Sequence, residues 1–278
     1  MGKLDKKAAI VTGAARGHAK ALAVLFAKEG ALVSICDILP VKELEATVGA
    51  EIRAAGGKAI CFQTDVCKEE QVNKMVQETI KQYGTVHILA NVVGIAGPTK
   101  DIRDTSLAEW KQTLEINLDS AFLCSKAVLP EMIKNNYGKI INFSSGTGKQ
   151  PLTHRLPYAT SKMGIIGFTR TLAADVGRYN INVNAICPGV HQERSLELAK
   201  ARAQYLGKPF DEEAYRKQFQ EQKNNPKKIL AGRWSADEGY SDKGSGPEDA
   251  ARLAVFLASD DSASMTGQDI QTDGVVMW

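Results

Sequence analysis

The sequence lacks the features that mark membrane proteins and disulfide-stapled proteins. No apolar run reaches the roughly 18 residues that a membrane-spanning helix requires, and the charged start of the chain contains no signal-peptide core. The five cysteines are odd in number and form no Cys-x-x-Cys pair. Together these absences predict free thiols in a reducing compartment, and we expect a cytoplasmic protein.

Excess charge of one sign and clustered metal ligands are also missing. The chain has 35 Lys and Arg against 32 Asp and Glu, so its net charge is only +3 over 278 residues. This balance predicts no nucleic-acid partner and no membrane-surface partner. The four histidines are scattered, and no His, Cys and Asp cluster has metal-ligand spacing, so we expect no metal.

Strand-like apolar runs alternate with amphipathic segments of helix length. The expected strands are Ala8–Thr12, Leu32–Cys36, Ala59–Gln63, Ile88–Asn91, Lys139–Phe143, Asn182–Ile186 and Asp269–Thr272. The expected helices between them are Ala19–Glu29, Val41–Ala55, Glu69–Tyr83, Leu107–Asn135 and Tyr158–Tyr179. Parallel strands joined by helical crossovers produce this alternation. The pattern predicts an α/β fold, in which residues 1–278 form a single Rossmann-like domain with a doubly wound parallel sheet.

The segment 190–246 interrupts this rhythm, because it is polar, long and without a clear strand. Leu196–Leu206 and Asp211–Gln222 have the pattern of helices, and Pro226 ends the second one. Loops of this length in compact domains are usually functional or disordered. Since the segment follows a strand end, where open α/β sheets bind ligands, we expect a substrate lid. A surface excursion used in subunit contacts is the alternative.

A glycine-containing turn, Thr12–Ala19, joins the first expected strand to the first expected helix. A pyrophosphate can bind the N–H groups of a helix N-terminus where no bulky side chain blocks it, which suits Gly13 and Gly17. Asp37 ends the second strand, where a carboxylate accepts hydrogen bonds from ribose hydroxyls and repels a 2′-phosphate. The turn therefore predicts NAD over NADP, against a weak counter-signal from Arg16. A plain glycine turn is the alternative.

Tyr158 and Lys162 are spaced i, i+4 and share one face of an expected helix. A free phenol titrates near pH 10, and a nearby ammonium favours the phenolate, which can then exchange a hydroxyl proton. Ser145 follows a strand end, where its hydroxyl can donate to a developing alkoxide. An exposed helix surface and an ordinary loop are the alternatives for these residues. Asn117 is polar within an apolar helical stretch and holds either backbone or water.

The order of these motifs resembles the short-chain dehydrogenase/reductase family over nearly the whole chain. The motifs are the glycine turn, Asp37, Asp65-Val66, Asn91-x-x-Gly94, Asn117, Ser145, Tyr158-x-x-x-Lys162 and Pro188-Gly189. The resemblance implies an NAD(H)-dependent oxidoreductase that interconverts a secondary alcohol and a ketone, and a homotetramer. The long segment 190–246 suits a bulky cyclic, steroid-like or aromatic substrate, and a polyol or sugar alcohol is the alternative. A non-catalytic NAD sensor is the alternative outside enzymes.

The resemblance also assigns a role to each site residue. Tyr158 would be the general acid/base, Lys162 would favour its phenolate and bind the nicotinamide ribose, and Ser145 would orient the substrate oxygen. Asn117 would hold a water in a proton relay through Lys162. The other expected cofactor residues are Gly13, Arg16, Gly17, His18, Asp37, Asp65, Val66, Asn91, Gly94, Pro188, Gly189 and His191. For Asp65, a turn or helix-capping aspartate is an equally good interpretation.

The sequence departs from the family pattern at three of these motifs. Ala19 replaces the third glycine of the phosphate turn, and Val92 replaces the second amide after the fourth strand. Glu193 stands where the family often has a threonine five positions after the proline. The last departure puts one contact to the nicotinamide carboxamide in doubt, and none of the three affects the four expected catalytic residues.

Overall fold

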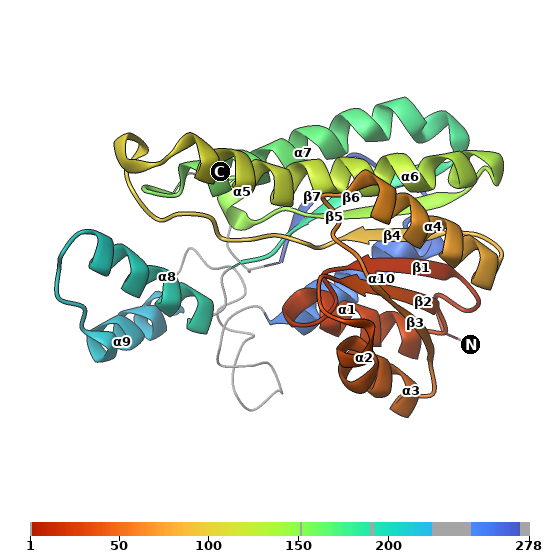
Figure 1. The fold of residues 1–278 in the computed structure, drawn as a ribbon, viewed down its shortest axis with the longest axis horizontal. Helices are drawn as coiled ribbons and strands as arrows, with labels where there is room; N and C mark the ends of the chain where they lie inside the picture. The colour runs from red at the N-terminus through yellow and green to blue at the C-terminus, as the bar shows by residue number, and fades with distance from the viewer. Residues whose placement is uncertain (1, 151, 190–191, 224–245, 273–278) are drawn as a thin grey trace.

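The computed structural model describes residues 2–150, 152–189, 192–223 and 246–272 (Figure 1). Within these ranges a single sheet of seven strands has the order β3-β2-β1-β4-β5-β6-β7, and every neighbouring pair is parallel. The strands are β1 (Ala8–Thr12), β2 (Leu32–Asp37), β3 (Lys58–Gln63), β4 (Ile88–Asn91), β5 (Gly138–Phe143), β6 (Ile181–Cys187) and β7 (Asp269–Gln271). The expected doubly wound sheet is confirmed.

Helices connect the successive parallel strands, and connections of this kind are almost always right-handed crossovers. They are α1 (Gly17–Lys28), α2 (Val41–Leu44), α3 (Ala50–Ala54), α4 (Glu69–Tyr83), α5 (Leu107–Leu114), α6 (Ser120–Lys134), α7 (Leu156–Val176), α8 (Gln192–Tyr205), α9 (Glu212–Lys223) and α10 (Pro247–Ala258). Two expected long helices are each interrupted by a π-helical turn, η1 (Glu45–Gly49) and η3 (Glu115–Asp119). The second of these turns contains Asn117.

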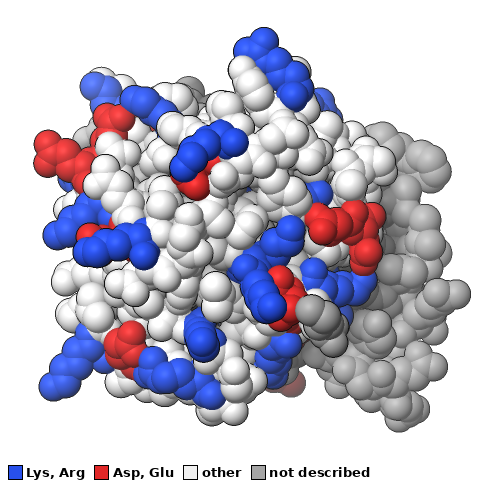
Figure 2. Space-filling model, turned by 90° about the vertical axis from the view of Figure 1, so that its right-hand side faces the viewer, with Lys and Arg blue, Asp and Glu red and all other residues white. Residues whose placement is uncertain are grey.

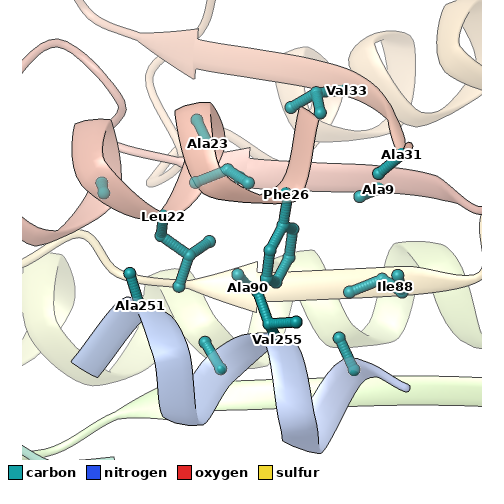
Figure 3. Close-up of a cluster of buried hydrophobic side chains, with 14 of the residues drawn as sticks. Ala9, Leu22, Ala23, Phe26, Ala31, Val33, Ile88, Ala90, Ala251 and Val255 are labelled. Carbon is teal, nitrogen blue, oxygen red and sulfur yellow. The ribbon is translucent and has the colours of Figure 1, made fainter. Parts of the chain in front are cut away.

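The helices cover both faces of the sheet. On one face α1 packs against α10, where Leu22 and Phe26 of α1 meet Ala251 and Val255 of α10 above Ala90 of β4 (Figure 3). On the other face α4, α6 and α7 bury a second apolar cluster. Since successive strand residues point to opposite faces, β1 contributes Ala9 and Val11 to the first cluster and Ile10 to the second.

The strand order makes the carboxyl ends of β1 and β4 the switch point of the sheet, which is where folds of this kind bind ligands. The chain moves outward from β1 to β2 and β3, then crosses back to β4 on the other side of β1. At such a switch point the connections leave in opposite directions and open a crevice. The glycine turn after β1 and the loop after β4 both lie there, so the expected site residues gather at this edge.

Charged side chains of both signs are mixed on the surface. Lys and Arg side chains lie among Asp and Glu side chains on the face shown in Figure 2.

All five cysteines are free, as expected. In the described part of the chain, no helix is both long and apolar enough to cross a membrane.

Candidate active site

The turn after β1 presents a helix N-terminus whose shape fits a pyrophosphate. Gly13 (φ +71°) and Gly17 (φ +59°) have left-handed backbone conformations that favour glycine. A Cβ on Gly13 would lie 2.9 Å from the Val93 Cγ2 atom, whereas a Cβ on Gly17 would meet no atom within 4 Å. Arg16, the exposed N-cap residue of α1, makes no side-chain cap hydrogen bond. The first N–H groups of α1 are therefore free of a side-chain cap and suited to a phosphate.

His18 and Ala19 occupy the first turn of α1 at the positions where the motif departs from the family. The His18 ring is half-buried, and its centroid lies 6.0 Å from that of Phe143 at the end of β5. The side chain therefore lies against the sheet edge. Ala19 is 3% exposed and belongs to the core between α1 and the sheet. The helix accommodates its methyl group without a break.

Asp37 lies at the end of β2, directly beside the phosphate turn. Its Oδ2 atom accepts the N–H of Ala15 at 3.1 Å, and its Oδ1 atom accepts the N–H of Leu39 at 3.4 Å. The N–H groups of Gly13 and Ala14 in turn bond to the Cys36 carbonyl at 2.8 and 3.0 Å. A carboxylate has further lone pairs beyond these two bonds, so Asp37 can still accept from ribose hydroxyls.

Asp65 and Val66 follow β3 at the same edge of the sheet. Asp65 Oδ1 accepts the N–H of Cys67 at 2.9 Å, which is an Asx turn. Of the two interpretations from sequence, the turn-forming aspartate describes this oxygen, and the contact to adenine stays a prediction. Val66 is 5% exposed and packs in the second apolar cluster.

Asn91 and Gly94 begin the loop after β4, but they have different surroundings. The Asn91 Nδ2 atom donates to Asn142 Oδ1 at 2.9 Å and to Ser125 Oγ at 3.2 Å, so this amide ties β4 to β5 and α6. A Cβ on Gly94 would lie 3.2 Å from the Lys162 Nζ atom and 3.3 Å from the Asn117 Oδ1 atom. Glycine at this position therefore leaves room beside two expected catalytic groups.

Asn117 lies in the π-helical turn η3 and is 1% exposed. Its Oδ1 atom accepts the N–H of Ile95 at 2.7 Å, and its Nδ2 atom donates to the Ile95 carbonyl at 3.0 Å and to Ser161 Oγ at 2.9 Å. The side chain thus joins the loop after β4 to α7. Of the two interpretations from sequence, backbone holding describes the side chain, and the water relay stays a prediction. Single π turns of this kind recur at functional sites.

Lys162 is a buried cation at the end of β5. It is 4% exposed, and its Nζ atom donates to the Phe143 carbonyl at 2.8 Å. Burial lowers the pKa of Lys162 to about 8, because its ammonium has lost most of its contact with water. Ser144 Oγ donates to the Lys162 carbonyl at 2.7 Å and so fixes α7 to the same strand end.

Tyr158 and Ser145 lie on the two segments that Lys162 joins. Tyr158 is half-buried in the first turn of α7, and its ring centre lies 5.9 Å from the Lys162 Nζ atom. Ser145 follows β5 and is 6% exposed; its Oγ atom accepts the N–H of Thr147 at 3.2 Å, which leaves the hydroxyl proton for another acceptor. The structure therefore gathers the four expected catalytic residues at one edge of the sheet.

Arg155 is a residue at the site that the sequence motifs do not mark. Its guanidinium carbon lies 4.7 Å from the centre of the Tyr158 ring, and its Nη1 atom donates to Thr99 Oγ1 at 3.0 Å. Arg155 is only 5% exposed. The sequence could have indicated Arg155 only through its position three residues before Tyr158, which is about one helical turn away.

The chain after β6 leads to the expected lid through two residues that were expected to bind the cofactor. Pro188 is buried and its carbonyl accepts the N–H of Gly146 at 3.0 Å, while Gly189 is half-buried. His191 lies outside the described residues, as do residues 224–245 of the expected lid. Helices α8 and α9 form the described part of that segment, and Figure 1 shows them projecting from one end of the sheet.

Tyr205 at the end of α8 connects this projecting part to the loop after β4. Its hydroxyl accepts the N–H of Asp101 at 3.1 Å and donates to the carboxylate of Asp104. The Tyr205 ring lies 6.0 Å, centroid to centroid, from the ring of His154. Helix α8 is therefore fixed to both loops that flank Tyr158.

Among the residues that the structure describes, no group of three or more His, Cys, Asp or Glu side chains is arranged to hold a metal ion.

Comparison with known proteins relates the chain to a protein family. The sequence profile of the family described as short chain dehydrogenase matches residues 7–202. An NAD-dependent glycerol dehydrogenase from Listeria innocua is 37% identical over 272 residues, which cover 98% of this chain and 94% of the relative. The oxidoreductase YxbG from Bacillus subtilis is 35% identical over 278 residues, which cover 100% of this chain and 93% of the relative.

Solved structures share the fold of this chain. The crystal structure of NAD+-bound xylitol dehydrogenase superposes with a TM-score of 0.85 at 29% identity, covering 98% of this chain and 99% of the other. That of levodione reductase superposes with a TM-score of 0.81 at 26% identity, covering 97% of both chains. The chain belongs to the short-chain dehydrogenase/reductase family, and it is an oxidoreductase that acts on CH–OH or C=O groups with a nicotinamide cofactor.

Proposed function

We propose that this protein is an NAD(H)-dependent oxidoreductase that interconverts a secondary alcohol and a ketone. The observation that carries the proposal is the Tyr158–Lys162 pair at the carboxyl end of β5, with the buried Lys162 ammonium 5.9 Å from the centre of the tyrosine ring. A phenol beside a buried cation can exchange a proton near neutral pH. The fit of the glycine turn to a pyrophosphate supports a dinucleotide as the partner of this pair.

Each catalytic residue has one task in alcohol oxidation. Gly13, Gly17 and Asp37 would hold the dinucleotide, whose nicotinamide ring would supply the acceptor for the hydride of the alcohol carbon. The Tyr158 phenolate takes the hydroxyl proton, and the Ser145 hydroxyl donates to the substrate oxygen as its negative charge develops. Lys162 favours the phenolate through its ammonium, which the Phe143 carbonyl holds at 2.8 Å. Asn117 keeps the loop after β4 against α7 through its bonds to Ile95 and Ser161.

The preference for NAD over NADP rests on Asp37. Its carboxylate is held beside the phosphate turn by the Ala15 N–H, where it would bind ribose hydroxyls and repel a 2′-phosphate. The ratio of kcat/KM with NAD to that with NADP tests this directly. Asp37→Ala should lower that ratio by about 10- to 100-fold, which corresponds to the loss of a charged hydrogen bond. A wild-type enzyme that prefers NADP would contradict the assignment.

For the substrate we propose a bulky cyclic, steroid-like or aromatic ketone or alcohol. Exposed apolar side chains near the site support this: Leu152 (49% exposed) and Leu156 (40%) flank the start of α7, and Leu206 (39%) follows α8. Helices α8 and α9 would cover such a substrate, with Tyr205 fixing α8 to the loop after β4. Apolar surface at the mouth of a pocket favours apolar ligands.

A polyol is the second candidate substrate. The glycerol and xylitol dehydrogenases among the similar proteins favour it, and both carry NAD in their names. A panel that contains glycerol, xylitol, a cyclohexanol and a hydroxysteroid, each assayed with NAD, separates the two classes. Shortening Leu196–Gln222 should change the KM for a bulky substrate far more than the KM for NAD. If no member of the panel, and no ketone with NADH, is turned over, the enzyme assignment gives way to an NAD sensor.

We also propose that the protein is a homotetramer. Phe122 of α6 (50% exposed) and Met163 of α7 (43% exposed) are large apolar side chains on helices that pack together on one face of the sheet. The apolar residues Val275, Val276, Met277 and Trp278 also favour a subunit contact, and they lie outside the described residues. Light scattering at micromolar concentration measures the mass, and a clean monomer near 30.1 kDa would contradict the proposal.

A further inference from the structure

A second cation lies on the ring of Tyr158. The Arg155 guanidinium carbon is 4.7 Å from the ring centre, which is closer than the 5.9 Å of the Lys162 Nζ atom. Arg155 is the N-cap residue of α7, and its carbonyl accepts the N–H of Ala159 at 2.8 Å. The residue that starts the helix therefore also covers the tyrosine in its first turn.

Contacts from a distant loop hold Arg155 in this position. Its Nη1 atom donates to Thr99 Oγ1 at 3.0 Å, 56 residues earlier in the chain. The carbonyl of the preceding residue, His154, accepts the N–H of Lys100 at 3.0 Å. His154 has φ +62°, a left-handed conformation that is unusual outside glycine and costs free energy. The surrounding contacts stabilise this turn, and the turn directs the chain into α7 with Arg155 over the ring.

Arginine has an electrostatic property here that Lys162 lacks. Burial lowers the pKa of Lys162 to about 8, so its ammonium loses its proton in the alkaline range where alcohol oxidation needs the phenolate. A guanidinium stays protonated throughout that range. A cation over an aromatic ring is attracted to its face, and the attraction grows when the ring becomes an anion.

Several charged groups on the elements around Tyr158 are held in ion pairs or hydrogen bonds. Among the described residues, Lys100 pairs with Glu109, Lys149 and Arg170 pair with Asp269, Arg103 pairs with Asp101, and Asp104 accepts from Tyr205. The His154 ring lies against the Tyr205 ring. Arg155 and Lys162 are the described cations that contact the Tyr158 ring.

We propose that Arg155 is a positioning residue that holds the Tyr158 ring and favours its phenolate together with Lys162. This inference rests on the proposed function, because it requires that Tyr158 carries the proton. It adds to that function a cation whose charge does not titrate in the working range of the enzyme. The catalytic tyrosine then keeps a cationic neighbour even at pH values where Lys162 is neutral.

The test is the pH profile of kcat/KM for alcohol oxidation with NAD in variants of Arg155. Arg155→Met removes the charge and keeps much of the packing, so the midpoint of the rising limb should move to higher pH by roughly one unit. A lysine buried at this position would lose its proton in the alkaline range, as Lys162 does, so the midpoint of Arg155→Lys should lie between those of the wild type and Arg155→Met. A purely structural role would lower the plateau in both variants without moving the midpoint.

Arg178 provides a control just beyond the other end of α7. Its guanidinium carbon lies 4.8 Å from the centre of the Tyr179 ring, so Arg178→Met removes an exposed arginine–tyrosine stack far from the site. Its pH profile should coincide with that of the wild type. Because Arg155 is buried, Thr99→Val provides a milder second variant that removes one anchor and keeps the charge. Its midpoint should move in the same direction by a smaller amount.

The possible outcomes separate this inference from the proposed function. Unchanged midpoints in both Arg155→Met and Thr99→Val would overturn the role of Arg155 and leave the enzyme assignment intact. A midpoint for Arg155→Lys above that of Arg155→Met would also overturn it, because a lysine there carries at least as much positive charge as a methionine. Near-normal turnover by Tyr158→Phe would instead overturn the proposed function itself.

Discussion

The two ends of strand β5 each carry a buried lysine next to a tyrosine. At the beginning of the strand, the Lys139 Nζ atom lies 6.0 Å from the centre of the Tyr137 ring. At the end of the strand, the Phe143 carbonyl holds Lys162, whose Nζ atom lies 5.9 Å from the centre of the Tyr158 ring. Burial lowers the pKa of both lysines. By distance and burial of the cation alone, the two pairs are almost the same.

The two pairs differ in the hydrogen-bond partner of the tyrosine hydroxyl. Tyr137 donates its hydroxyl proton to Asp260 Oδ1 at 2.8 Å, and burial together with this carboxylate raises the pKa of Tyr137 well above its ordinary value. Lys139 is held by Asn182 Oδ1 at 2.7 Å. For the Tyr158 hydroxyl, no hydrogen-bond partner occurs among the described residues, and Arg155 lies over its ring. A lysine near a tyrosine therefore favours proton transfer only where no carboxylate holds the phenol proton.

The position of each pair in the sheet explains why their surroundings differ. The carboxyl ends of parallel strands lead into the long loops and helix N-termini that bind ligands, whereas the amino ends receive the chain from helix C-termini. The Tyr158 pair is at the carboxyl end, beside the glycine turn and Asp37. The Tyr137 pair is at the amino end, where Lys7 also lies 3.9 Å from the Tyr137 ring centre.

Removing the two hydroxyls should have the largest and most unequal effects. Tyr158→Phe keeps the ring packing and removes the proton carrier, so kcat should fall by about 10²- to 10⁴-fold while NAD affinity changes little. Tyr137→Phe should leave kcat within about twofold and lower the free energy of unfolding by about 1 kcal/mol, because it removes the bond to Asp260. Steady-state kinetics, NAD titration and urea denaturation measure these effects. Comparable losses of kcat in both variants would contradict the distinction.

Replacing the two lysines should separate catalysis from stability. Lys162→Met removes the ammonium beside Tyr158 and a proposed bond to the nicotinamide ribose, so kcat should fall and the KM for NAD should rise. We expect kcat/KM to fall by about 10- to 100-fold. Lys139→Met should leave both kinetic parameters near wild type. If Lys139→Met impaired NAD binding as strongly, the amino end of β5 would have to communicate with the site.

Lys162 should make the free energy of unfolding depend on pH in the alkaline range. The pKa of Lys162 is about 8 in the folded protein and about 10.5 in the unfolded chain, so the unfolded chain binds more protons between these values. Stability from this group therefore rises with pH across that window. From pH 7 to 9.5, the free energy of unfolding of the wild type should rise relative to Lys162→Met by about 2 kcal/mol. Urea denaturation at both pH values measures the difference, and a constant difference would contradict the lowered pKa.

The smallest expected effect concerns His87, which lies beside the Tyr137 pair. Burial, with help from Lys7, lowers the pKa of His87 below 6.5, and its Nδ1 atom accepts the N–H of Ala8 at 2.9 Å. Its contribution to stability is complete above pH 6.5 and is lost as the pH falls below that value, because the unfolded chain binds the proton first. His87→Gln should reduce the loss between pH 7.5 and 5 by a few tenths of a kcal/mol. An unchanged acid slope in thermal unfolding would exclude this role.

Much of the fold could be predicted from the sequence because its signals are local. The strand bounds agree to within one or two residues, since runs of Val and Ile and the turns between them are read within a few positions. Helix boundaries were less accurate where the cause lies elsewhere in the chain. The turn η3 interrupts the expected helix Leu107–Asn135 at Asn117, whose side chain bonds to Ile95 and Ser161. The helical periodicity of the sequence does not indicate which distant residues a side chain such as Asn117 will bond to.

By itself, the sequence determined the alternation of strands and helices, the glycine turn with Asp37 after it, and the i, i+4 spacing of Tyr158 and Lys162. These features depend on neighbours in the chain, so backbone geometry and helical periodicity are sufficient to predict them. Only the tertiary structure decided that Lys162 is buried against the Phe143 carbonyl and that Thr99 holds Arg155 over the Tyr158 ring. Those contacts join segments 19 and 56 residues apart, and they form only when the crossovers bring the loops after β4 and β5 to the same edge of the sheet.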